Sequence, residues 1–245
     1  TSTNKKALEI AETYHLVNSK QSLENENTKT VRLSDGTKAQ VQIVGFKADT
    51  FTDDGLPAGI TFMFRTPIAM RAVNNSAATG GWEQSSLRKW LADKGMATLP
   101  DDLRNQIRSV RKLTNNTGGT KDASSITATD DKLWLPSMSE LCGYQAPETF
   151  AEGCEYLSAL YSGEGEQYQL YREQSVSGLT TNDAMIRTLA GKKIYYWERT
   201  PSADCSEGAD STYFNRVGKD GDVFSWATPG NDPDQMTYVL PGFCI

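Results

Sequence analysis

The C-terminal segment from Tyr195 to Ile245 places the strongest constraint on the fold of this chain. Its two ends, YYWERTP and VLPGFCI, are dense in aromatic, apolar, proline and glycine residues, which favour buried strands and fixed turns. The stretch between these ends is rich in small and polar residues. We therefore expect a rigid frame that holds an adaptable polar surface, an arrangement typical of recognition modules.

Composition and charge exclude several classes of protein. The chain has 245 residues, 38% hydrophobic and 23% charged, and is long enough for one large globular domain, with or without an appendage. No apolar run reaches the roughly 18 residues that a membrane-spanning helix needs, so we expect no membrane span. The net charge of −6 and the lack of a basic cluster predict that nucleic acid is not a partner.

The single histidine argues against an enzyme. A Ser-His-Asp triad or a multi-histidine metal site would have to include His15, for which a surface or packing role in a helix is expected. We therefore predict no catalytic residue, no metal site and no cofactor.

The four cysteines are Cys142, Cys154, Cys205 and Cys244. None forms a CxxC pair, so a zinc ribbon is not expected. We predict that all are reduced or that one bridge joins Cys142 to Cys154, across 11 intervening residues.

Residues 3–27 have a helical pattern, and residues 1–29 are predicted to be an N-terminal helical extension. The apolar residues that recur at three- and four-residue steps are Ala7, Ile10, Ala11, Tyr14 and Val17. Two roles remain open for this helix. It joins the domain to a larger assembly or to copies of itself, or it packs on its own domain.

Strands are predicted at both ends of the remaining chain. A hairpin is expected over residues 30–46 with its turn at Asp35-Gly36, and a strand region follows from Gly59 and ends near Pro67. The C-terminal segment TYFNRVGKDGDVFSW predicts a second hairpin with Asp220-Gly221 at its tip, and residues 239–245 predict one final strand.

Helices are predicted between these strands. Gly80-Gly81 permits a close chain approach before a helix that contains Trp82 and Trp90 and is capped by Gly95. A second helix starts at LPDDL, with a buried stripe at Leu103, Ile107 and Val110. Residues 114–131 are expected to form a polar loop.

Beyond this loop, a short apolar strand ends at Pro136, and Ser137 caps a helical turn. Residues 144–193 are expected to be an insertion of short helices and loops. We expect four tryptophans to lie mainly in the core: Trp82, Trp90, Trp134 and Trp197.

Five motifs in order resemble one family more specifically than any of them does alone. They are GGWEQSSLRKWL, LPDDLRNQIRSVRKLT, DKLWLPSMSELCG, YYWERTP and VLPGFCI. Together they resemble a bacterial and phage family of C-type-lectin-like domains, which includes surface and tail-associated proteins. The resemblance covers about residues 30–245. It implies an α+β fold, with irregular small antiparallel sheets flanked by helices.

Such domains are similar in plan to formylglycine-generating enzymes and to the variable proteins of diversity-generating retroelements. In variable proteins the C-terminal segment is rewritten while its frame stays constant. The resemblance thus implies a ligand- or receptor-binding module on a phage virion or a cell surface. Its partner would be a protein or glycan on a host or neighbouring cell.

The polar C-terminal stretch occupies the place where variable proteins carry their variable residues. Tyr213, Phe224, Trp226 and Tyr238 are candidate aromatic anchors, and the small and polar residues would supply adaptable hydrogen bonds. The candidate ligand-binding residues are Ser202, Ala203, Asp204, Asp210, Thr212, Tyr213, Asn215, Asp222, Phe224, Ser225, Trp226, Thr228, Asn231, Asp232 and Tyr238.

Two alternatives remain open. An enzyme of the formylglycine-generating type would need a cysteine pair, for which Cys205 and Cys244 are the only C-terminal candidates. A calcium-dependent sugar-binding lectin could use oxygen ligands from Asn231 to Gln235 and from Asp220 and Asp222. The tripeptides typical of sugar-binding members, Glu-Pro-Asn and Gln-Pro-Asp, do not occur.

Overall fold

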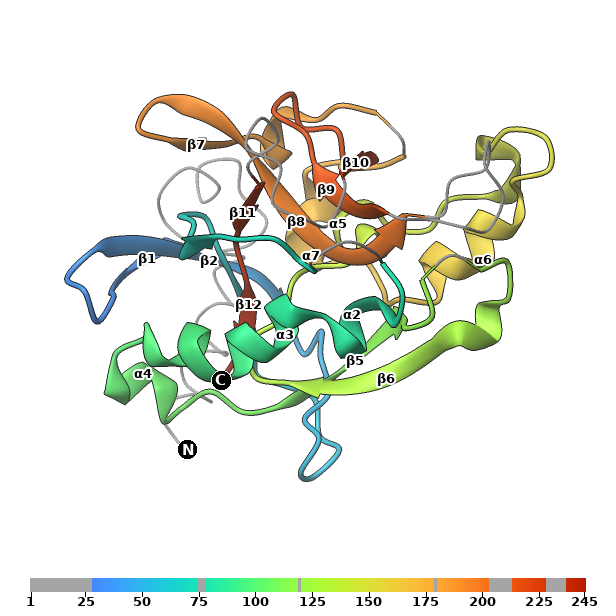
Figure 1. Cartoon of the computed structure of the whole chain (residues 1–245). Coiled ribbons are helices and arrows are strands. Elements are labelled where there is room, and N and C mark those ends of the chain that lie inside the picture. Colours follow the sequence, from blue (N-terminus) through green and yellow to red (C-terminus); the bar gives the residue numbers. More distant parts are fainter. Residues whose placement is uncertain (1–27, 75–77, 119, 179, 203–212, 228–236) are drawn as a thin grey trace.

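The computed structural model is a mixed α+β fold built from small sheets flanked by short helices (Figure 1). It describes residues 28–74, 78–118, 120–178, 180–202, 213–227 and 237–245, with the backbone alone at Trp226. The predicted helix over residues 3–27 lies outside this part of the chain. The first described strand begins at Thr28.

The first sheet has four antiparallel strands in the order β1-β2-β3-β12. These are β1 (Thr28–Arg32), β2 (Lys38–Phe46), β3 (Ile60–Phe64) and β12 (Gly242–Cys244). The predicted hairpin is confirmed, because β1 and β2 pair across a turn in which Gly36 has a φ of 86°. All five side chains of β3 are buried, so both faces of this sheet are covered at its centre.

The second sheet has the order β10-β9-β8-β11-β4, with β7 paired to β8. Its strands are β10 (Ser225–Ala227), β9 (Tyr213–Val217), β8 (Lys192–Ser202), β11 (Thr237–Val239), β4 (Ala69–Met70) and β7 (Arg187–Leu189). The antiparallel pairing of β9 and β10 confirms the predicted C-terminal hairpin.

The single strand predicted over residues 239–245 is wrong. β11 pairs with β8 and β4, whereas β12 pairs with β3 in the other sheet. Pro241 lies between them and lacks the backbone N–H that a continuous ladder would need. The C-terminal residues therefore join the two larger sheets.

The third sheet pairs β5 (Val110–Asn115) with β6 (Ile126–Asp131). It corrects two predictions. The helix after LPDDL is only α4 (Asp101–Arg104), and Val110 lies in β5. The expected polar loop over residues 114–131 ends in β6. In β5 Lys112 is buried and Leu113 is 41% exposed, so the hydrophobic pattern that would mark a strand is inverted here.

The close approach predicted at Gly80-Gly81 is confirmed. α2 (Gly81–Gln84) begins beside β5, and a Cβ on Gly81 would lie 2.3 Å from the carbonyl oxygen of Asn115. α3 (Ser86–Trp90) continues directly into η2 (Leu91–Gly95), a single π-helical segment. Gly95 therefore lies inside a helical segment and does not cap it.

The other helices are short, as expected for the insertion. Ser137 caps α5 (Met138–Cys142) in a complete capping box with Glu140, which confirms the predicted helix start. The remaining helices are η3 (Ala123–Ser125), η4 (Pro147–Thr149), α6 (Tyr156–Ser162), α7 (Gln169–Glu173) and η5 (Asp183–Met185). Among the described residues, no helix is long and apolar enough to cross a membrane.

The tryptophan prediction holds for three of its four residues. Trp82, Trp134 and Trp197 are fully buried, whereas Trp90 is half-buried under the guanidinium of Arg71, 5.0 Å from the ring centre. The buried rings anchor α2, the segment before α5, and β8 in one core.

The predicted bridge between Cys142 and Cys154 is wrong. Cys142 and Cys244 are free and buried, whereas Cys154 is disulfide-bonded. Cys142 donates from its thiol to the carbonyl of Met138, one turn back in α5. Cys205 lies outside the described residues.

Candidate functional site

The candidate ligand-binding residues fall into two groups. Seven lie outside the described residues, and only the backbone of Trp226 is described. The seven are Ala203, Asp204, Asp210, Thr212, Thr228, Asn231 and Asp232. Of the other seven, five lie on strands of the sheet that both polar segments leave and rejoin: Ser202, Tyr213, Asn215, Ser225 and Tyr238. Asp222 and Phe224 lie in the connection between β9 and β10.

Two of the described candidates are buried. Ser202 is 3% exposed at the end of β8, and Asn215 is fully buried in β9. The amide of Asn215 points toward the sulfur of Met138 in α5, at 3.6 Å. Side chains in these positions support the sheet and have little surface for a ligand.

Asp222 and Phe224 have structural tasks in the β9–β10 connection. The Asp222 carboxylate accepts from the backbone N–H of Phe224 at 2.8 Å, and its carbonyl accepts from Gly218 at 2.7 Å. The Phe224 ring packs edge-on against Tyr161 and Phe150, with centroids 5.9 and 6.4 Å apart. The aromatic anchor predicted here thus packs partly against the insertion.

A cationic cluster that sequence reasoning missed lies beside the half-buried Tyr195. The Arg216 guanidinium is stacked 3.8 Å from the Tyr195 ring centre, and the ammonium of exposed Lys219 is 4.8 Å from it. Arg216 also donates to the hydroxyls of Ser225 and Thr237, both at 3.4 Å. These two hydrogen bonds of Arg216 connect β9 to β10 and to β11. The predicted residue Ser225 takes part in it.

The strand directions determine how the two polar segments connect. Residues 203–212 join β8 to its antiparallel neighbour β9. β10 and β11 both run parallel to β8 and lie on opposite sides of the β8–β9 pair. β10 and β11 therefore do not form a hairpin, because two parallel strands cannot be joined by one. Both polar segments begin and end on one rigid sheet.

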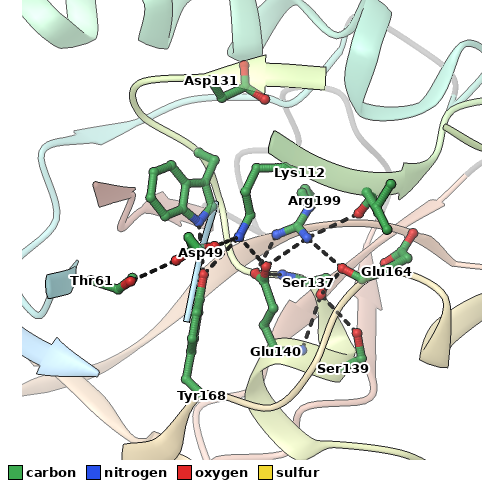
Figure 2. A network of polar contacts seen from close by, with 12 residues as sticks. Asp49, Thr61, Lys112, Asp131, Ser137, Ser139, Glu140, Glu164, Tyr168 and Arg199 are labelled. Atoms are coloured by element: carbon green, nitrogen blue, oxygen red, sulfur yellow. Dashed lines mark hydrogen bonds and ion pairs between the residues drawn. The ribbon is translucent and has the colours of Figure 1, made fainter. Parts of the chain in front are cut away.

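A buried ionic network attaches β8 to the neighbouring elements α5 and β5 (Figure 2). Arg199 is fully buried and uses both ends of its guanidinium. It donates to both carboxylate oxygens of Glu140 in α5, to the hydroxyl of Thr114 in β5 at 2.9 Å, and to the carbonyls of Leu113, Leu135 and Glu164. This bidentate pair joins β8 to α5 and β5 with a fixed geometry.

Lys112 completes the network from β5. Its ammonium is paired with both Asp49 and Glu140, donates to the Tyr168 hydroxyl at 3.0 Å, and lies 4.7 Å from the ring centre of Trp134. Figure 2 shows Lys112 and Arg199 pointing toward Glu140 from two sides. Asp49 in turn accepts from the Thr61 hydroxyl at 2.7 Å. Because each charge has a partner, ion pairing compensates the cost of burying Lys112 in β5.

The two buried glutamates of this region titrate differently. Burial works to raise the pKa of Glu140, but Arg199 and Lys112 outweigh it and hold that pKa at about 2. Burial raises the pKa of Glu164 to about 7, although Arg199 opposes the shift. Glu164 accepts from the backbone of Asn115 at 2.9 Å and from the Thr200 hydroxyl. A polar cavity of about 110 Å³ adjoins both glutamates.

Glu198, in β8, is a third buried glutamate. Neither carboxylate oxygen has a hydrogen-bond partner, and the side-chain oxygen of Asn215 also lacks one. Burial raises the pKa of Glu198 well above its usual range, with Glu164 and Asp222 adding to the shift. Burial therefore favours the neutral form of this carboxyl group.

The described residues bear on metal-dependent and cysteine-dependent chemistry. They contain no cluster of three or more His, Cys, Asp or Glu side chains that could hold a metal ion. Cys244 is fully buried, with its thiol 3.3 Å from the Thr61 hydroxyl, and burial raises its pKa well above the usual range. A thiol kept protonated and inaccessible is a poor nucleophile. The other C-terminal candidate, Cys205, lies outside the described residues.

A signal for the ionic network is present in the sequence. Arg199 lies inside the apolar motif YYWERTP, and Glu140 lies inside LWLPSMSELC. Charged residues within apolar runs are rarely buried unless they are paired or lose their charge. The sequence alone does not show that these two residues pair, or that Lys112 and Asp49 join them.

The comparisons with known proteins bear on this fold. The family described as "Domain of unknown function (DUF6273)" matches residues 58–244, from the residues before β3 to the end of β12. The chain belongs to this family. The DUF6273 domain therefore contains the whole C-terminal sheet, together with Arg199, Glu140 and Lys112. The β1–β2 hairpin and Asp49 lie outside the match. Neither a curated protein nor a solved structure matches the chain.

Proposed function

We propose that this DUF6273 protein is a ligand- or receptor-binding module with a C-type-lectin-like plan. Its binding surface comprises the two polar segments, residues 203–212 and 228–236, and the half-buried side chains beside them. In this proposal it acts as a variable protein of a diversity-generating retroelement, displayed on a phage virion or a cell surface. Its partner is a protein or glycan of a host or neighbouring cell.

One observation carries the proposal: both polar segments begin and end on a single sheet, at positions that are buried or half-buried. Ser202, Ala227 and Thr237 are each at most 3% exposed, and Tyr213 is half-buried. The Arg199–Glu140 pair fixes β8 to the core only three residues before the first segment. A frame of this kind supports exchange of the intervening side chains, because exposed polar substitutions usually change stability by less than about 0.5 kcal/mol.

The cationic cluster favours an acidic or aromatic group on the ligand. Arg216 and Lys219 both lie over Tyr195, at the end of β8 where β11 begins. An aromatic face flanked by cations suits carboxylates and planar rings. The alternative of a formylglycine-generating enzyme has no comparable support, because Cys244 is buried and protonated.

The binding proposal can be tested with a displayed library. Asp204, Asp210, Thr212, Thr228, Asn231 and Asp232 would be randomised together and selected against a purified serum albumin as a test target. A matched library would randomise six exposed positions of the β1–β2 hairpin. We expect binders from the first library only, with melting temperatures close to the parent's.

Two results would contradict the proposal. Most members of the first library could fail to fold, which would make these side chains structural. Alternatively, both libraries could yield binders equally often, which would leave the C-terminal segments with no special role. A near-repeat of the final coding segment beside a reverse-transcriptase gene would support the retroelement version. Its absence would count against that version alone.

A further inference from the structure

A large apolar groove lies on the outer face of the first sheet. Its volume is about 700 Å³. Across its floor, Ile43, Phe62 and Phe243 form one cross-strand row over β2, β3 and β12, with the two phenyl rings stacked 5.1 Å apart. Val41, Ile60 and Val31 extend this apolar floor.

The sheet needs a covering layer on this face. An antiparallel sheet with one face in water alternates buried and exposed residues, but all five residues of β3 are buried. Thr61 and Met63 face inward, where Thr61 contacts Asp49, so Ile60 and Phe62 face the groove. Among the described residues outside the strands of this sheet, Pro100, Asp102, Leu103 and Ile245 line the groove.

The chain itself supplies a segment of the right kind at the right place. Lys29 and Thr30, at the start of β1, line the groove, so the 27 preceding residues join the domain at its edge. Residues 3–17 carry Ile10, Tyr14 and Val17 at helical spacing, and such a helix would be about 22 Å long. The polar residues 18–27 extend to about 30 Å, enough to fold back.

The N-terminal segment needs an apolar surface to pack on, and the groove needs a covering layer. A helix of about 15 residues is marginal in water unless an apolar face is packed against a surface. The floor of the groove is apolar, and an amphipathic helix laid into such a groove is a common recognition mode. Burial of the Ile and Val side chains is favourable because it removes apolar surface from water.

We propose that residues 3–17 form a helix that docks into this groove of the same molecule, with Ile10, Tyr14 and Val17 against Ile43, Phe62 and Phe243. The first sheet is then completed by sequence that lies outside the DUF6273 match. This inference is independent of the proposed ligand-binding function, which concerns the other sheet.

The test is methyl NMR on the full chain with labelled isoleucines. We expect nuclear Overhauser contacts from the Ile10 methyl and Tyr14 ring to the methyls of Ile43 and Ile60. In Ile10→Asp these contacts are lost, the Ile43 and Ile60 methyls shift, and the dye anilinonaphthalene sulfonate gains fluorescence. Unchanged methyls of Ile126 and Ile194, remote from the groove, show that the fold is intact.

His15→Asp is the matched control. It adds the same charge within residues 3–17, five residues after Ile10 and about 140° around the helix axis, and should leave contacts and dye fluorescence unchanged. A sample that mixes labelled and unlabelled chains separates contacts within a molecule from contacts between molecules. Contacts seen only between molecules would assign the groove to a second copy and overturn the proposal. No contacts, with dye binding already present in the wild type, would also overturn it.

Discussion

At the scale of single residues, the main feature is a network of four buried charged side chains. Arg199, Lys112, Glu140 and Asp49 neutralise one another in the interior, where each is at most 6% exposed. Removing one partner leaves another charge unpaired in the interior, which lowers stability far more than the loss of an exposed ion pair. Residue substitutions here should therefore affect stability strongly and non-additively.

The first prediction concerns the Arg199–Glu140 pair. Arg199→Met and Glu140→Gln should each lower the free energy of unfolding by roughly 3–5 kcal/mol, because each leaves an uncompensated buried charge. The double variant should lose less than the sum of the two, since the residues are in direct contact. Urea denaturation of all four proteins measures the coupling. Strictly additive losses would show that the pair does not act as a unit.

The second prediction follows from Glu164. Its pKa is raised from 4.5 to about 7 by burial, so the folded protein binds this proton more tightly than the unfolded chain. Its contribution to stability is fully present below about pH 4.5 and is lost as the pH rises through 7. Glu164→Gln should remove this pH dependence. The free energy of unfolding of the variant, relative to that of wild type, should therefore rise by roughly 3 kcal/mol between pH 5 and pH 8.

Chemical denaturation at several pH values checks this, with exposed Glu166→Gln as the matched control. The control should keep a constant offset from wild type across the same range. If Glu164→Gln follows wild type in parallel between pH 5 and 8, then the buried carboxyl does not keep its proton.

At the scale of elements, close packing of α2 on β5 governs how the central helices are placed. Gly81 has a φ of 51° and starts α2 against Asn115 and Asn116. The left-handed region and the lack of space above its Cα both favour glycine. The same arrangement lets Trp82 donate from its indole N–H to Asp131 at 3.0 Å, which links α2 to β6.

The third prediction separates steric crowding from backbone strain. Gly81→Ala would place a Cβ 2.3 Å from a backbone oxygen, whereas Gly36→Ala, at a φ of 86°, would place its Cβ in open space. Gly36→Ala should cost about 1–2 kcal/mol from backbone strain alone. Gly81→Ala should cost clearly more, because β5 must also move. Equal losses in thermal denaturation would contradict the close approach of α2 to β5.

At the scale of the whole molecule, the last residues connect the sheets. β11 pairs with β8 and β4, and three residues later β12 pairs with β3. Gly242 also exchanges backbone hydrogen bonds with Trp134 at 2.7 and 3.2 Å. The C-terminus is thus held from several sides, and Cys244 is enclosed there.

The fourth prediction uses the buried thiols as probes of this packing. Cys142 and Cys244 are free and at most 2% exposed, so iodoacetamide should label neither in the native protein. Both should be labelled after unfolding without reductant, whereas Cys154 should need reduction first. Peptide mass spectrometry locates each label. Native labelling of Cys244 would show that the C-terminal strand opens readily.

Local signals in the sequence determined the parts of this protein that depend on neighbouring residues. The hairpin turns at Gly36 and Gly221, the capping box at Ser137 and the close approach at Gly81 were predictable, because each depends on the conformational range or hydrogen bonds of a few adjacent residues. The ligand-binding residues remain a prediction, and about half of them lie outside the described residues.

Only the tertiary structure decided the rest. Lys112 points inward because Asp49 and Glu140, distant in sequence, meet it there, and no periodicity in VRKLTN could indicate those partners. The last strand divides because its two halves find partners in different sheets. Pairing of strands and burial of charges depend on groups brought together by the whole fold, which local propensity does not encode.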